Sequence, residues 1–367
     1  MSIPHILSRV SSRSVFSLRG APSRVAFRPL SAANKPGAAA SKPDMALIRE
    51  LREASGAPVV DCKNALAADG VEGDIGRAFQ WLRKRGISKA TSMADRSANE
   101  GKWLKQSGGA GGGVIGLRVD GSRGALVEVN SETDFVARNA KFQGFVEKAL
   151  EAALEKAGGD GAVPVTRELD VAELLRVERP GSGEVLADSL AHLIGAVREN
   201  ITISRAQVVS LGKAEGVVGG YVHGAMGPGV GKNAALVALK LDATTKGNSG
   251  ALETLNASAK SLAMHVVAMR PAFLDEASAP KAAIEKETKL LLDEARESGK
   301  NPKYLDKMVE GRLRKFLETN ALVCQAHMVA EGNPKVADYL RDLKGEAGGT
   351  VTVEGFARLC VGERESL

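Results

Sequence analysis

Apolar residues recur at helical spacing near the start of the chain, between Met45 and about Gly86. This spacing predicts three short helices, separated by the breaks "SGAP" and "ADG". Pro58 suits the first turn of the second helix, and Asp74 can cap the third. Four apolar residues share one face of that third helix: Ile75, Ala78, Phe79 and Leu82. We therefore expect a small three-helix module here.

The period changes to two after the glycine-rich run "GGAGGG" at residues 108–113. Two runs of alternating apolar residues, in "VIGLRV" and "ALVEV", flank an Asp-Gly turn and predict a β-hairpin. A helix is expected next, because five apolar residues fall on one stripe: Phe142, Phe145, Val146, Ala149 and Leu150.

The same order of hairpin and helix recurs later in the chain. "GVVGGYVHGAMGPGVGKNAALVALKLD" predicts a second hairpin, and an amphipathic helix follows it, with Leu252, Leu255, Leu262 and Val266 in phase. Between the two units the pattern favours a helix over residues 185–198 and a strand in "ITISRAQVVSL". We expect an α+β fold with a duplicated core, in which each half covers one face of a small antiparallel sheet.

The last part of the chain begins with a predicted pair of long helices joined at "SGKNP". Ile284, Leu291 and Leu292 line the first helix, and Val309 and Leu313 line the second. This helical hairpin is expected to project from the core. A helix in "VADYLRDL" and a strand in "GTVTVEGFARLCVGE" close the chain.

Charge is distributed unevenly along the chain. No Asp or Glu precedes Asp44, whereas the same stretch holds seven basic residues and many serines. This composition is typical of an organelle transit peptide; a disordered basic tail is the alternative. Its five arginines and two lysines favour a mitochondrion over a plastid. Without these seven residues, the chain has 43 basic and 44 acidic residues and is nearly neutral. The net charge of +6 therefore does not indicate nucleic-acid binding.

Composition predicts neither a metal site nor a membrane protein. Cys62, Cys324 and Cys360 are far apart and lack C-x-x-C spacing, and the five histidines are scattered. We expect reduced cysteines, no metal cluster and no cofactor. Apolar runs are too short to span a bilayer, so a soluble protein is expected.

"GPGVGKN" (residues 227–233) superficially resembles a phosphate-binding loop. The first position of that motif would be Met226, and Asn233 replaces the Ser or Thr that would hold magnesium. The flanking pattern is that of a hairpin, so a structural turn is favoured over a nucleotide site.

His265 lies near the edge of its helix's apolar stripe. A partly exposed surface histidine is favoured, and contact with a partner protein is the alternative. Catalysis is not expected, because no Ser, Cys or carboxylate pattern would orient this imidazole as a base.

The stretch "NSETDFVARN" follows the first predicted hairpin and contains Asp134 beside Phe135. If one helix ran unbroken from Thr133, Phe135 would share a face with Phe142 and be a core residue. If instead Asn139 ends one turn and caps a new helix at Ala140, Phe135 could project from a rigid corner. The pattern alone leaves both arrangements open.

The same stretch closely resembles the "TDFVA" motif of the elongation factor Ts family. "LREASGAPVVDCKNAL" resembles the family's N-terminal motif, and "YVHGA", "AMHVVAMRPAF", "KMVEGRLRKF" and "GFARLCVGE" resemble later blocks in the same order. The resemblance covers about Met45 to Glu363, and with the N-terminal stretch it indicates an organellar member, in the mitochondrial matrix.

The resemblance implies an exchange factor that is not an enzyme and promotes GDP release from the GTPase elongation factor Tu. In this chain Thr133, Asp134, Phe135 and Val136 would disturb the magnesium site of that partner, and His265 is a possible further contact. No nucleic acid, membrane or small-molecule substrate is implied. A rival interpretation makes the N-terminal module a ubiquitin-type adaptor, and another makes "GPGVGKN" the nucleotide site of an enzyme.

Together with the composition of the N-terminal stretch, the resemblance implies a division into domains. A transit peptide and linker would occupy residues 1–43, and a ubiquitin-associated-like three-helix domain residues 44–90. The N-terminal half of the core would span residues 91–212. Its C-terminal half would span 213–279 and 319–367, interrupted by a coiled-coil helical hairpin at 280–318.

Overall fold

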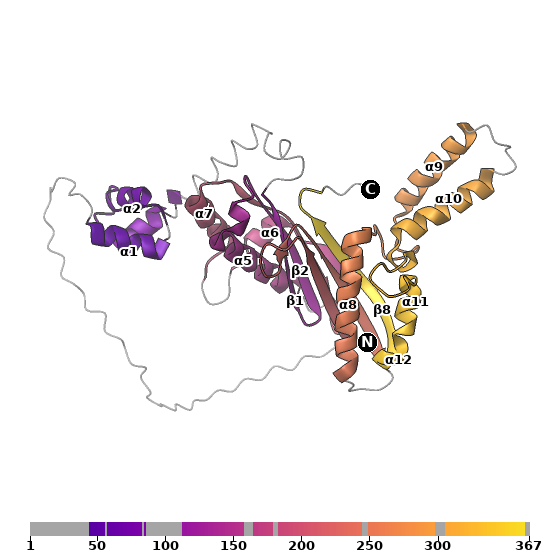
Figure 1. The fold of residues 1–367 in the computed structure, drawn as a ribbon. Coiled ribbons are helices and arrows are strands. Elements are labelled where there is room, and N and C mark those ends of the chain that lie inside the picture. Colours follow the sequence, from indigo (N-terminus) through magenta and orange to yellow (C-terminus); the bar gives the residue numbers. More distant parts are fainter. Residues whose placement is uncertain are drawn as a thin grey trace, which may run out of the picture. The chain divides into compact units, whose positions relative to one another are not determined.

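The computed structural model describes six stretches of the chain. They are residues 44–85 (apart from 56 and 83), 112–157, 164–178, 183–243, 249–297 and 305–363. The predicted transit peptide and linker, residues 1–43, therefore lie outside the described residues. Within them, helices combine with antiparallel sheets in an α+β fold (Figure 1).

Three helices form the first described stretch, as the spacing of apolar residues predicted. They are α1 (Met45–Ser55), α2 (Val59–Leu66) and a helix over 75–82. Asp74 caps the third helix, because its Oδ1 accepts the Arg77 backbone N–H at 2.7 Å. Leu51, Cys62, Ala65 and Ala78 are fully buried between these helices. The helices thus share one small core.

A five-stranded antiparallel sheet has the order β3-β4-β2-β1-β6. The predicted first hairpin forms its centre, with β1 (Val114–Asp120) and β2 (Arg123–Ser131). The strand predicted in "ITISRAQVVSL" is β4 (Ile201–Ser210), which pairs with β2 on one side and β3 (Val165–Glu168) on the other. Two residues of the "GPGVGKN" turn add β6 (Val230–Gly231) beside β1.

A second antiparallel sheet has the order β5-β7-β8. The predicted second hairpin supplies β5 (Gly216–His223) and β7 (Asn233–Ala243), and the closing strand is β8 (Gly349–Cys360). Alternate residues of β7 point toward α8 (Ser249–Met269) and are buried there: Ala235, Val237, Leu239 and Leu241. Leu252, predicted in the same stripe of α8, is instead 49% exposed.

The two sheets pack face to face, with helices on their outer faces. Ile115 and Leu126 of the first sheet share one apolar cluster with Leu236 and Leu359 of the second. On the outer face of the first sheet lies α5 (Ala140–Ala157), with its predicted stripe buried, followed in the chain by α6 (Val171–Leu175) and α7 (Leu186–Val197). On the outer face of the second lie α8, α11 (Val336–Asp342) and α12 (Lys344–Ala347).

A buried ion pair joins the two sheets at one end. Glu128 of β2 is 2% exposed, and its Oε2 accepts from Arg205 Nε of β4 at 2.8 Å. Arg205 also donates to the Cys360 carbonyl at the end of β8, and the Gly362 N–H donates to Glu128 Oε1. Every charge in this group therefore has a partner, as a buried ion pair requires.

The predicted pair of long helices is α9 (Lys281–Glu297) and α10 (Leu305–Asn320). Leu291 and Val309 are buried where the two helices meet, with Leu292 and Leu313 packed against them. Figure 1 shows the pair extending away from the sheets. Among the described helices, none is both long and apolar enough to cross a membrane.

Candidate functional site

The connection between β2 and α5 forms a corner that presents Phe135 to solvent. Phe135 is 82% exposed, and Thr133 and Asp134 beside it are also exposed. Val136 is 6% exposed and Ala137 is fully buried, in the short 3₁₀ turn Val136–Arg138. Of the four predicted site residues, three thus face solvent, while Val136 anchors the corner in the core under α5.

A new helix begins after Asn139, so the alternative of one unbroken helix from Thr133 is wrong. Asn139 has an extended backbone, with φ −74° and ψ 129°. Its Oδ1 accepts from the Lys141 N–H at 2.9 Å, and its carbonyl accepts from the Gln143 N–H at 3.0 Å. Asn139 thereby caps α5. The helical phase between Phe135 and Phe142 is broken, and only Phe142 is buried.

Gly112, which precedes β1, packs directly against the strand side of the corner. A Cβ atom at Gly112 would lie 1.7 Å from the Thr133 carbonyl oxygen, so only glycine fits there. The buried Ser131 hydroxyl lies 2.7 Å from the Gly112 carbonyl and 2.8 Å from the Thr133 carbonyl, and either can accept its proton. The backbone at residues 131–133 therefore has little room to move.

Glu199 binds Thr133 through both oxygens of its carboxylate. The Thr133 backbone N–H donates to Oε2 at 3.0 Å, and the Thr133 hydroxyl donates to Oε1 at 2.7 Å. Glu199 lies between α7 and β4, far from Thr133 in the sequence. Hydrogen bonds to a charged acceptor are the stronger ones in proteins, so this pair restrains the corner.

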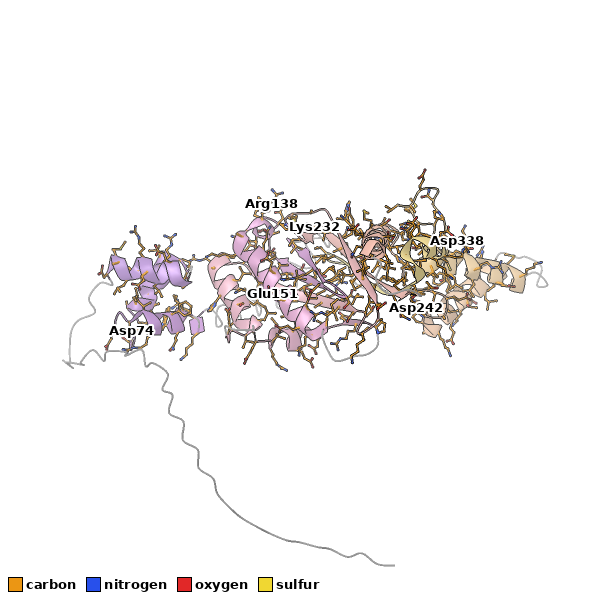
Figure 2. The ribbon with its side chains drawn as sticks, turned by 90° about the horizontal axis from the view of Figure 1, so that it is seen from below. Asp74, Arg138, Glu151, Lys232, Asp242 and Asp338 are labelled. Atoms are coloured by element: carbon orange, nitrogen blue, oxygen red, sulfur yellow. The ribbon has the colours of Figure 1, made fainter. Side chains whose placement is uncertain are left out.

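Lys232 approaches the same region from the turn that precedes β7. Its Nζ donates to the Gly113 carbonyl at 2.8 Å. Burial lowers the pKa of Lys232, and the nearby charge of Asp134 opposes that change. "GPGVGKN" is a structural turn, as predicted, and its lysine is engaged with the backbone of the protein itself. Figure 2 labels Lys232 together with Arg138, the exposed last residue of the 3₁₀ turn.

His265 is fully buried, so the prediction of a partly exposed surface histidine is wrong. Its Nε2 lies 2.9 Å from Gln325 Oε1, and its Nδ1 accepts from the Met328 N–H at 3.2 Å. These partners suit a neutral ring with the proton on Nε2. Burial lowers the pKa of His265, while the hydrogen bond to Gln325 opposes that change.

The cause of the error is the chain after α10, which covers the edge of α8. Helical spacing within α8 could not show that residues 325–328 pack there. In this structure the His265 side chain supports that segment and is not available to contact a partner. Phe135 and its exposed neighbours are therefore the better candidates for a contact site.

Glu199, Gly112 and Lys232 were not singled out from the sequence. Each of them contacts the corner from a segment distant in the sequence. The spacing of apolar residues within a segment does not show which other segment it contacts. The register of β2 and β4 would have identified Glu199, because it places residue 199 opposite residue 133 beyond the last pair, Ser131 and Ile201.

The fold and the corner define an α+β protein that presents an exposed Thr-Asp-Phe projection on a restrained base. Comparison with known proteins shows which family this is. The sequence model described as "Elongation factor TS" matches residues 132–363. The chain belongs to the elongation factor Ts family, a family of translation elongation factors.

Relatives along most of the chain carry the same description. The chain is 40% identical over 317 residues to elongation factor Ts of Paramagnetospirillum magneticum, covering 86% of this chain and 90% of the relative. It is 42% identical over 318 residues to that of Gluconobacter oxydans, covering 87% and 91%. It is 38% identical to that of Rhodospirillum centenum, covering 87% and 92%. These relatives are bacterial.

Proposed function

We propose that the protein is a guanine-nucleotide exchange factor for elongation factor Tu. It promotes release of GDP from that GTPase, so that GTP can bind in its place. Membership of the elongation factor Ts family supports this proposal. The observation that carries it is the 82% exposure of Phe135 beside Asp134 on a restrained corner.

The corner acts on the magnesium site of the partner. A GTPase holds its nucleotide through a phosphate loop and a Mg²⁺ ion that bridges phosphate oxygens. An exchange factor forms and breaks no covalent bond, so the protein is not an enzyme in that sense. It stabilises a state of the partner that binds the factor well and the nucleotide poorly, and the coupling is reciprocal.

Each residue of the corner has a distinct role in this mechanism. Phe135 inserts into the partner as an apolar wedge, and Asp134 redirects hydrogen bonds around the ion site. Thr133 holds the strand side of the corner through Glu199, and Val136 anchors the other side in the core. The projecting pair is thus fixed at both ends.

Burial of the Phe135 ring alone does not supply enough free energy to release the nucleotide. Burying a Phe side chain contributes about 1.5–3 kcal/mol of transfer free energy. Loosening a nucleotide a thousandfold requires about 4 kcal/mol, at about 1.4 kcal/mol for each tenfold change. A broad interface with elongation factor Tu therefore supplies the remainder. We assign that interface to the N-terminal module and both halves of the core.

The proposal extends to the domains of the protein and to its compartment. The three N-terminal helices form a ubiquitin-associated-like domain, the core is a duplicated unit, and α9 and α10 form a coiled-coil insertion, with the boundaries expected from the resemblance. Residues 1–43 direct the protein to the mitochondrial matrix, and the partner is the elongation factor Tu of that compartment. Import of a reporter fused to residues 1–43 into isolated mitochondria, with loss of the leader, tests the localisation.

The exchange assay is the direct test of function. Elongation factor Tu loaded with fluorescent GDP is mixed with excess unlabelled GDP, with and without the purified protein. We expect the protein to accelerate GDP release by orders of magnitude. An unchanged release rate would contradict the proposal. Capture of ubiquitin in place of elongation factor Tu would then support the adaptor interpretation, and binding of a fluorescent GTP or ATP analogue would support the enzyme interpretation.

A further inference from the structure

Glu199 continues the pairing of β2 and β4 after their backbone hydrogen bonds have ended. In the register of these antiparallel strands, Asn130 faces Thr202 and Ser131 faces Ile201. Thr133 and Glu199 stand two residues further along in each direction, so they face each other. There the Glu199 carboxylate accepts the two Thr133 hydrogen bonds. A side chain thus holds the chain where the sheet no longer does.

The backbone around Glu199 is well fixed. Arg198 ends α7 in the left-handed conformation, with φ 65°, and its N–H donates to the Ile194 carbonyl at 2.8 Å. Asn200 is 2% exposed, and β4 begins at Ile201. Glu199 therefore lies between the C-cap of α7 and the start of β4, a central strand of the sheet. Its carboxylate reaches the corner from a rigid support.

The Thr133 end of the contact bears directly on the exposed pair. Thr133 precedes Asp134 and Phe135, and Val136 follows them as a buried residue. One end of this short segment is fixed by packing and the other by the Glu199 carboxylate. If that carboxylate were removed, the contacts of Ser131 and Gly112 would still hold the strand side.

We propose that Glu199 is a positioning residue for nucleotide exchange, acting through Thr133. This proposal rests on the exchange function proposed above. The carboxylate holds Asp134 and Phe135 in the conformation in which they insert into the partner. The corner is therefore already ordered before the partner binds. Groups held in place before a reaction step lower its barrier, and misplacement by about 1 Å can slow such a step about a hundredfold.

The experiment compares Glu199→Ala and Thr133→Val with Thr133→Ser. Glu199→Ala removes both hydrogen-bond acceptors. Thr133→Val removes the hydroxyl alone, whereas Thr133→Ser keeps the hydroxyl and removes only the methyl group. Glu155→Ala is the matched control, because Glu155 is an exposed glutamate near the other end of α5. GDP release from elongation factor Tu is measured over a range of factor concentrations, which separates the maximal rate from the half-saturating concentration.

We expect Glu199→Ala to lower the maximal release rate about tenfold, the factor that corresponds to about 1.4 kcal/mol. The half-saturating concentration should change little, because the broad interface remains. Thr133→Val should be slowed less than Glu199→Ala, and Thr133→Ser, which keeps the hydroxyl, should recover most of the rate lost in Thr133→Val. Glu155→Ala should be unchanged. Glu199→Ala combined with Thr133→Val should be no slower than Glu199→Ala alone, since both act on one contact.

Amide hydrogen exchange on the isolated protein gives a second readout that needs no partner. In Glu199→Ala, the backbone amide hydrogens of residues 132–136 should exchange faster. The melting temperature and the amide hydrogen exchange rates of β2 and β4 should stay close to those of the unmutated protein. Unchanged protection at residues 132–136 would overturn the positioning role.

The outcomes separate this proposal from the function on which it rests. If Phe135→Ala is slow while Glu199→Ala exchanges at the unmutated rate, the positioning role is wrong and the exchange function stands. If the unmutated protein does not accelerate GDP release, the exchange function fails, and the positioning role for exchange fails with it. Hydrogen exchange would then still report whether Glu199 restrains the corner.

Discussion

Phe135 and Val136 are neighbours in the chain, yet their side chains are 82% and 6% exposed. The sharp turn after Thr133 produces this difference, because it directs one apolar side chain outward and the next into the core. Scattered exposed apolar residues are ordinary, but an aromatic ring held outward beside a carboxylate is an anchor of the kind that interfaces use. The individual residues that restrain this turn are therefore as informative as Phe135 itself.

Gly112 offers a test of that restraint. We expect Gly112→Ala to displace the corner, because the new Cβ would overlap the Thr133 carbonyl. GDP release should slow, whereas the melting temperature should fall only modestly, because the shift affects one connection and not the sheets. The measurements are the maximal release rate and thermal unfolding by circular dichroism.

Gly144→Ala is the control for this substitution. Gly144 lies on α5, where an added Cβ would meet no heavy atom within 4 Å, so exchange should be unaffected. A Gly112→Ala protein with the unmutated release rate would show that close packing at residue 112 does not set the geometry of the corner.

At the scale of the elements, the strands and helices predicted from the spacing of apolar residues are present. The sequence did not show which of these elements pack against each other. Period two in β1 and β2 predicted the hairpin but not β6, because two residues inside a turn carry no periodic pattern. β2 is buried along almost its whole length, since α5 covers one face and the second sheet covers the other. Alternation shows which residues share a face, but it does not show what covers each face.

The same limit explains the error at His265. Its position on α8 was predicted correctly, but its burial depends on the segment after α10. There His327 is also fully buried; its ring contacts His265 and Tyr339 edge-on, at 5.2 and 4.7 Å between centroids. A Tyr339 hydroxyl bonded to Ser258 completes this polar group between α8 and α11. Interactions between elements of this kind leave no trace in the period of either helix.

These histidines make the stability of the α8 region dependent on pH. Burial lowers the pKa of His327 to about 4, and the neighbouring His265 adds to that change. The ordinary value applies in the unfolded chain, so the unfolded state takes up a proton first as the pH falls. This contribution to stability is complete above about pH 6.5 and is lost progressively as the pH falls toward 4.

We therefore expect the free energy of unfolding to fall by about 2 kcal/mol between pH 7 and pH 5 on account of His327. Urea unfolding at the two pH values measures the change. His327→Phe, which keeps a ring beside Tyr339, should remove this part of the pH dependence. An equal pH dependence in His327→Phe and the unmutated protein would show that His327 does not cause it.

For the molecule as a whole, the two sheets form the support on which the corner stands. Leu126 and Leu236 lie in the apolar layer between the sheets, and the Glu128–Arg205 pair fastens the end of β8 to β2 and β4. Both β2 and β4, the strands that lead to Thr133 and away from Glu199, are thereby central and well packed. The sequence predicted two hairpin–helix units around one small sheet, whereas each unit contributes to a sheet of its own and the two sheets stack face to face.

The resemblance to elongation factor Ts identified the exposed motif, which periodicity alone could not distinguish from a buried helix start. The structure adds the restraints on that motif, and these come from residues remote in the sequence. A stiff support matters for the proposed function, because a ring on a flexible loop would lose much of its binding free energy to ordering.

GDP release from elongation factor Tu driven by Phe135→Ala at saturating concentration tests the role of the exposed ring most directly. We expect this variant to bind nucleotide-free elongation factor Tu still, but its maximal release rate should fall by about 10- to 100-fold, the factor expected for about 1.5–3 kcal/mol. Leu290→Ala, which truncates an exposed apolar residue of α9, should release GDP at the unmutated rate. A Phe135→Ala protein that drives GDP release as fast as the unmutated one would show that Phe135 is not the residue that opens the nucleotide site.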